Sequence, residues 1–142
     1  MCLKQFQELC RSLVGSPVFV AKFTEIFFSL LSIVWICDSL YPSYRSIFYS
    51  ELVYFTWYGF LFINIFILVG HFISEPVSKK LTVLISLIGA IFHIISSFIL
   101  IETWNDKGFK RHLASAVFTV LNFVVFVLDT VFFWRYGSNY SD

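Results

Sequence analysis

Charged residues are scarce in this sequence. Only 13% of the 142 residues are charged, whereas 58% are hydrophobic, and the mean hydropathy is +0.82. Soluble domains carry about a quarter charged residues, and the 19 phenylalanines alone exceed what one small soluble core buries. The scarcity of charge therefore excludes a soluble domain and predicts an integral membrane protein. The net charge of +1 gives no reason to expect a nucleic-acid partner.

Cysteines and catalytic motifs are equally sparse. The three cysteines, Cys2, Cys10 and Cys37, show neither paired spacing nor a metal-ligand pattern. The sequence has no nucleophile–base motif, no Cys-x-x-Cys and no phosphate-binding glycine loop. We therefore expect no enzyme activity, no cofactor and no metal site. Cys2 and Cys10 lie close to the first apolar run and are candidates for palmitoylation if they are cytosolic, although free thiols are the simpler interpretation.

Long hydrophobic runs are what the chain has in abundance. A helix needs about 20 apolar residues to cross a bilayer, and no small-residue cleavage site follows the first run, so it is kept as a span. The predicted spans are residues 17–40, 52–74, 81–101 and 113–135. Their connections are short, which predicts a single domain: an all-α, antiparallel four-helix transmembrane bundle with up-down-up-down topology.

The basic residues predict the orientation of this bundle. Six of the ten Lys and Arg residues fall on the side of the termini and four fall on the other side. Because basic residues favour the cytosol, both termini are predicted to be cytosolic. The aromatic residues around the two outer loops are typical of a membrane–water interface.

Polar residues recur at helical spacing within every predicted span. Lys22, Glu25, Ser29 and Ser32 step by three and four residues along the first span, which places them on one face. Similar stripes occur in the other spans: Trp57, Asn64 and His71; Ser86, Gly89, His93 and Ser97; and Ser115, Thr119, Asn122 and Asp129. Membrane helices use small and hydrogen-bonding residues where they meet. The stripes are therefore predicted to face one another, with Phe, Leu, Ile and Val facing lipid.

The depth of these residues divides them into two groups. At a rise of 1.5 Å per residue, one polar layer lies roughly 15–18 Å from the cytosolic surface, and a cluster of ionisable residues lies roughly 5–12 Å deep. The mid-membrane layer is Asn64, His93 and Asn122, and the cytosolic cluster is Lys22, Glu25, His71 and Asp129. In this cluster Lys22 is the natural counter-ion of Glu25 or of Asp129. Two interpretations stay open: a structural tie between helices, or a proton or cation pathway.

Two segments resemble those of MARVEL-domain tetraspans, the group of MAL-type and chemokine-like-factor-type membrane proteins. The first is GSPVFVAKFTEIFFSLLSIVW, with small residues at its start and Glu25 about a third of the way along. The second is ASAVFTVLNFVVFVLDTVFFWRY, with Ala114, Ala116 and Phe118 early and Asp129 late. The resemblance covers about residues 13–136. It implies four spans, cytosolic termini and a role in organising membranes rather than catalysis.

The expected function is therefore a non-enzymatic scaffold acting in vesicle trafficking, membrane apposition or cell-junction assembly. Its expected partners are membrane lipids, other membrane proteins and further copies of itself, bound by lateral association. Its expected location is the plasma membrane, including junctions, or trafficking vesicles. The alternative is a small proton- or cation-coupled transporter, or a channel subunit, that uses Glu25 and Asp129.

Overall fold

The chain forms a bundle of apolar helices in a computed structural model, which describes residues 15–37, 39, 41–73 and 75–136. Within these residues every regular element is a helix. The elements are α2 (Pro17–Ile36), α3 (Ile47–Tyr54), η1 (Phe55–Gly59), α4 (Phe60–Phe72), α5 (Lys79–Lys107) and α6 (Lys110–Tyr136). Because α3, η1 and α4 are continuous, the described residues contain four helices that are long and apolar enough to span a membrane.

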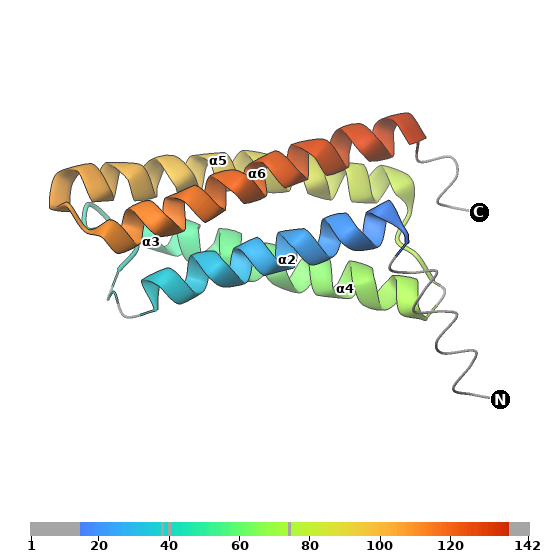
Figure 1. Cartoon of the computed structure of the whole chain (residues 1–142), viewed down its shortest axis with the longest axis horizontal. Coiled ribbons are helices and arrows are strands. Elements are labelled where there is room, and N and C mark those ends of the chain that lie inside the picture. Colours follow the sequence, from blue (N-terminus) through green and yellow to red (C-terminus); the bar gives the residue numbers. More distant parts are fainter. Residues whose placement is uncertain (1–14, 38, 40, 74, 137–142) are drawn as a thin grey trace.

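The four helices alternate in direction, as Figure 1 shows. The α6 helix packs against α5 and α2, and α2 also packs against α4. The start of α2 and the end of α6 lie at the same end of the bundle, beside the α4–α5 connection (Figure 1). The predicted all-α, antiparallel fold class is thus confirmed. The cytosolic position of the termini stays a prediction.

The helices differ from the predicted spans mainly at their outer ends. The first begins at Pro17 as expected but ends at Ile36 rather than at residue 40. The chain turns directly after Ile36, whose carbonyl oxygen accepts from Ser39 N at 2.7 Å. The second begins at Ile47 rather than at residue 52, because the side chain of Ser46 caps it by accepting from Phe48 N. Hydropathy alone misses such an end, because the first turns of this helix lie in a polar, aromatic segment.

The third helix extends beyond its apolar run to Lys107. Its last turns carry Glu102 and Asp106, which both pair with Arg45 from the loop before α3. Gly108 then ends the helix with φ +71°, a left-handed conformation that favours glycine over other residues. The helix is therefore longer than the hydrocarbon requires, and its polar end holds the α2–α3 connection.

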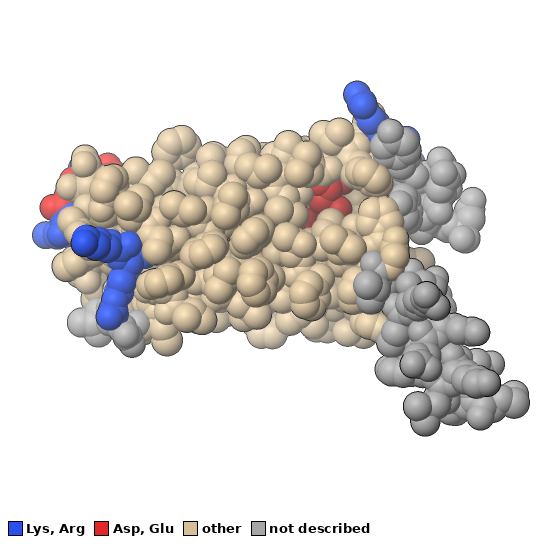
Figure 2. All heavy atoms as spheres, in the orientation of Figure 1, with Lys and Arg blue, Asp and Glu red and all other residues tan. Residues whose placement is uncertain are grey.

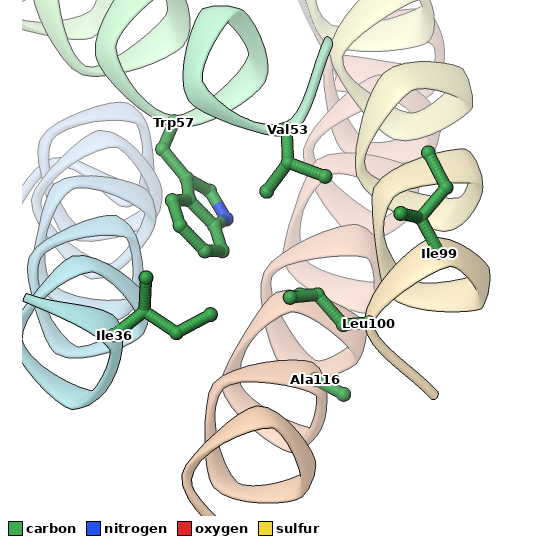
Figure 3. Close-up of a cluster of buried hydrophobic side chains, with 6 residues drawn as sticks. All are labelled: Ile36, Val53, Trp57, Ile99, Leu100 and Ala116. Carbon is green, nitrogen blue, oxygen red and sulfur yellow. The ribbon is translucent and has the colours of Figure 1, made fainter. Parts of the chain in front are cut away.

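The second span contains a π-helical segment, η1, in its middle. Here Thr56 and Trp57, adjacent in sequence, are both fully buried. A π turn adds a residue to the helical repeat and changes which residues face the interior afterwards. The segment places Trp57 in an apolar cluster between the four helices (Figure 3), formed by Ile36, Val53, Trp57, Ile99, Leu100 and Ala116.

The outer surface of the bundle is apolar. Large hydrophobic side chains on all four spanning helices are exposed, among them Phe66, Phe98 and Trp134. Figure 2 shows this on one face: uncharged residues cover most of the bundle, charged ones gather at its two ends, and acidic atoms are also visible in one hollow between them. The described residues show the predicted arrangement, with polar side chains buried between the helices and apolar side chains on the outer surface. This arrangement is typical of a protein whose helices are surrounded by lipid.

Candidate functional site: a buried polar column

The polar stripe of α2 lies along the inside of the bundle. Lys22, Glu25, Ser29 and Ser32 are all buried, and their spacing of three and four residues keeps them in line along one helix face. Polar residues of the other helices meet this stripe at successive depths. Together they form a column of hydrogen-bonded side chains, which we describe from the end that holds the start of α2.

The first group in the column is ionic and centres on Lys22. The Nζ atom of Lys22 donates to Glu25 Oε2 at 2.9 Å, to Asp129 Oδ2 at 2.7 Å and to Ser86 Oγ at 3.1 Å. Ser86 in turn donates to the same Asp129 Oδ2 at 2.6 Å. An ammonium group has three protons to donate, and each has an acceptor here. One side chain therefore joins α2, α5 and α6.

The charges of this ionic group do not balance. Two carboxylates, Glu25 and Asp129, share one ammonium group, so the three groups carry a formal charge of −1 when all are ionised. Lys22 Nζ also lies 5.4 Å from the centre of the Phe126 ring, at a distance where a cation is attracted to the ring. Buried charge of one sign is costly unless it is paired. The second carboxyl group is the chemical feature that distinguishes this group from a simple ion pair.

Asn64 lies beside the Glu25 carboxyl group. Its side chain interacts with that of Glu25, yet neither of its amide atoms makes a hydrogen bond to a described residue, and Glu25 Oε1 also lacks one. All three atoms are buried. The structure thus places Asn64 next to the ionic group, and it is not hydrogen-bonded to His93 or Asn122, with which the sequence grouped it.

The second group in the column centres on Asn122. Asn122 Nδ2 donates to Ser29 Oγ at 2.9 Å and to His93 Nε2 at 3.0 Å. His93 Nδ1 is 2.8 Å from the carbonyl oxygen of Gly89, which can only accept. These contacts fit a neutral imidazole with its proton on Nδ1. Asn122 and His93 therefore meet as their depths predict, and Ser29 completes the group.

The third group surrounds Trp57. Trp57 Nε1 donates to Thr119 Oγ1 at 3.2 Å, and this hydroxyl lies 2.8 Å from Ser115 O and 3.2 Å from Ser32 Oγ. Ser115 Oγ donates to Ser32 O at 2.9 Å. Hydroxyl and indole groups thus tie α2, η1 and α6 together, in the half of the bundle opposite to Lys22.

His71 is close enough to Lys22 for their charges to interact, but it is not hydrogen-bonded to the ionic group. It lies in the last turns of α4, is only half-buried, and makes no hydrogen bond or ion pair with Lys22, Glu25 or Asp129. The chain leaves the bundle directly after it, so fewer neighbours cover it. Cys2 and Cys10, the candidate palmitoylation sites, lie outside the described residues.

Two contributors were not singled out from the sequence. Ser86 belongs to the polar stripe of the third span, but no feature of the sequence indicates that it bridges Lys22 and Asp129. His112 is buried near the outer loops, where its Nε2 lies 3.2 Å from Tyr41 O. A histidine at the start of a span gave no signal of this contact, because its partner is 71 residues away.

The column contains no obvious metal site. In the described part of the chain, no three His, Cys, Asp or Glu side chains are grouped closely enough to hold a metal ion. What the ionic group can do chemically is hold a proton or pair with a cation, since it combines two carboxylates with one ammonium group.

Comparisons with protein families, with curated proteins and with solved structures give no match for this chain.

Proposed function

We propose that this protein is a non-enzymatic tetraspan scaffold that organises membranes by lateral association with lipids and other membrane proteins. The observation that supports this most is the division of side chains between the two surfaces of the helices. The polar residues of the column are buried and bonded to one another, and the outer surface offers mainly large apolar side chains.

This division of side chains supports a scaffold because an apolar helix face in a bilayer can contact lipid or another protein at similar energy. Helices in a bilayer gain no hydrophobic energy by meeting, so hydrogen bonds and close packing hold a bundle together. Here the column supplies those bonds inside each molecule. The outer faces, with Phe66 exposed by 70% and Phe98 by 64%, are therefore available to other membrane components.

The short connections support the same proposal. Residues 37–46 join α2 to α3, and residues 73–78 join α4 to α5. Segments of this length offer little surface outside the membrane for an enzyme site or a large adhesive contact. Contacts made within the bilayer are therefore the principal means by which the described residues can act on a partner.

The resemblance to MARVEL-domain tetraspans narrows the proposal. It suggests vesicle trafficking, membrane apposition or junction assembly, at the plasma membrane or in trafficking vesicles. The residues that carry it, Glu25 and Asp129, are the two carboxylates that Lys22 joins. In this proposal the shared ionic group stabilises the bundle and takes no part in chemistry.

The test is to compare partners of the wild type with partners of outer-face variants. Phe66→Ala and Phe98→Ala alter the lipid-facing surfaces of α4 and α5 without touching the column. We expect at least one variant to lose membrane proteins that co-purify in mild detergent, as measured by quantitative mass spectrometry, with unchanged expression. Unchanged partners in both variants, together with normal junctions and vesicles in cells that lack the protein, would refute the scaffold.

A second candidate, transport of protons or cations, is favoured by the column itself. Three polar groups follow one another along the bundle, and the ionic group contains two carboxyl groups for one ammonium group. Reconstituted protein should then show a proton or cation flux into liposomes that Asp129→Asn abolishes. The scaffold proposal instead expects negligible flux from both proteins.

A further inference from the structure

A groove on the outside of the bundle runs between the first half of α2 and the last half of α6. Its volume is about 490 Å³, within the range of small-molecule sites. Val20, Ala21, Val125 and Leu128 contribute apolar walls, and Asp129 also lines it. Figure 2 shows acidic atoms at the bottom of a hollow in an otherwise uncharged surface. Asp129 is the acidic residue among the described lining residues.

The two oxygens of Asp129 have different surroundings. Oδ2 accepts from both Lys22 and Ser86. For Oδ1, no hydrogen bond to a described residue is found. Glu25 Oε1 is an enclosed polar atom without a partner, and Asp129 Oδ1 is not among such atoms. Because Asp129 lines the groove, Oδ1 is the oxygen that a molecule in the groove can reach. The carboxylate therefore connects the buried ionic group with the outside of the bundle.

The charge of the ionic group determines which ligand fits. When both carboxyl groups are ionised, Lys22 compensates one of them, and a positive charge placed at Asp129 Oδ1 compensates the other. A charge that is not compensated is unfavourable within a bilayer. Thr24 and Asp129 are the polar side chains among the described lining residues, and no Lys or Arg is among them. An anion or a phosphate therefore has no partner here, and a bare metal ion has too few oxygen ligands.

We propose that this groove binds a lipophilic amine: a compact apolar molecule with a single protonated nitrogen. Its apolar body lies between α2 and α6, and its ammonium group donates to Asp129 Oδ1. The site opens toward the lipid, so the amine enters from the bilayer. This ligand site goes beyond the scaffold role and requires neither lateral partners nor transport.

The test uses the full chain in phosphatidylcholine nanodiscs and aminoadamantane as the probe. Binding is measured by equilibrium dialysis, and nanodiscs without protein correct for partition into lipid. We expect saturable binding of aminoadamantane and none of its neutral analogue adamantanol. Asp129→Asn should weaken the binding roughly tenfold or more, since it removes a charge-assisted hydrogen bond.

A second pair of variants separates the groove from the stability of the bundle. Leu128→Trp fills the groove from an exposed position and leaves the ionic group intact, and Leu84→Trp adds the same bulk to the exposed outer face of α5. We expect Leu128→Trp to abolish binding and Leu84→Trp to preserve it. Equal binding by both tryptophan variants would overturn the proposal. So would competition by phosphatidylethanolamine in the nanodisc, because the occupant would then be a lipid headgroup.

Discussion

Replacing Lys22 with methionine tests whether the ionic group stabilises the bundle. Methionine has a similar length and no charge, so Lys22→Met removes the ammonium group with little change in packing. The two carboxylates then face each other without the cation that lies 2.9 Å from Glu25 Oε2 and 2.7 Å from Asp129 Oδ2. The formal charge of the group changes from −1 to −2, in a site where Lys22 and Glu25 are fully buried.

The expected loss of stability is large. A hydrogen bond to a charged group contributes about 1.5–3 kcal/mol, and Lys22 makes two of them to carboxylates. Removing one partner of a buried ion pair typically costs about 3–5 kcal/mol. We therefore expect Lys22→Met to lower the free energy of unfolding by about 3–5 kcal/mol. Protonation of one carboxyl group would bring the loss toward the lower limit.

Asp129→Asn should be much milder, because it leaves the pair of Lys22 and Glu25 and removes the excess negative charge. A cost of about 1 kcal/mol is expected for the weakened hydrogen bond. The double variant Lys22→Met/Asp129→Asn should be more stable than Lys22→Met alone, since one of the two uncompensated carboxylates is gone.

Unfolding in mixed micelles with increasing dodecyl sulfate, followed by tryptophan fluorescence, measures these differences. Lys80→Met is the control, because Lys80 is exposed near the start of α5 and should change stability by less than about 0.5 kcal/mol. If Lys22→Met unfolds like the control, or is no less stable than Asp129→Asn, the ionic group does not hold the bundle together.

Three further variants test other parts of the interior. Gly89→Ala should lower the stability of the bundle by about 1–3 kcal/mol, because the added Cβ would lie 2.6 Å from a ring carbon of Phe126. In a Phe126→Leu background the same change should cost less, and an equal cost in thermal unfolding would contradict the steric explanation. Trp57→Phe keeps the apolar packing but loses the bond to Thr119, so chemical unfolding should show a loss of about 1 kcal/mol, and the same change should cost less in a Thr119→Val background, where that bond is already absent. Asn122→Ala should lower the stability by about 1–2 kcal/mol. Nitrogen NMR of His93 should detect the lost hydrogen bond, and an unchanged spectrum would show that Asn122 does not contact His93.

The positions of the polar residues inside the bundle follow from the sequence to a large extent. Lys22, Glu25, Ser29 and Ser32 had to share a face once α2 was a helix, and lipid on the outside left only the interior for them. Depth along each helix likewise brought Asn122 and His93 to the same level. These inferences need only a fixed rise per residue and the cost of placing polar groups in hydrocarbon.

The predictions for Asn64 and His71 depended on more than depth. A helical repeat through Trp57, Asn64 and His71 assumes a regular α-helix, whereas η1 interrupts it with a π turn. Asn64 lies beside Glu25, and His71 is half-buried at the end of α4. No local signal in the sequence reveals either result, since both depend on how α4 rotates against its neighbours.

The amino-acid sequence by itself determined that this protein lies in a membrane, that four helices cross it and which faces of α2, α5 and α6 turn inward. Composition and periodicity suffice for this, because they act residue by residue against the surrounding lipid. Only the tertiary structure decided that one ammonium group serves two carboxylates, that Ser86 bridges them and that Asp129 opens into a groove. Those facts depend on the register and rotation of α2, α5 and α6, which are set by packing between residues up to 107 positions apart.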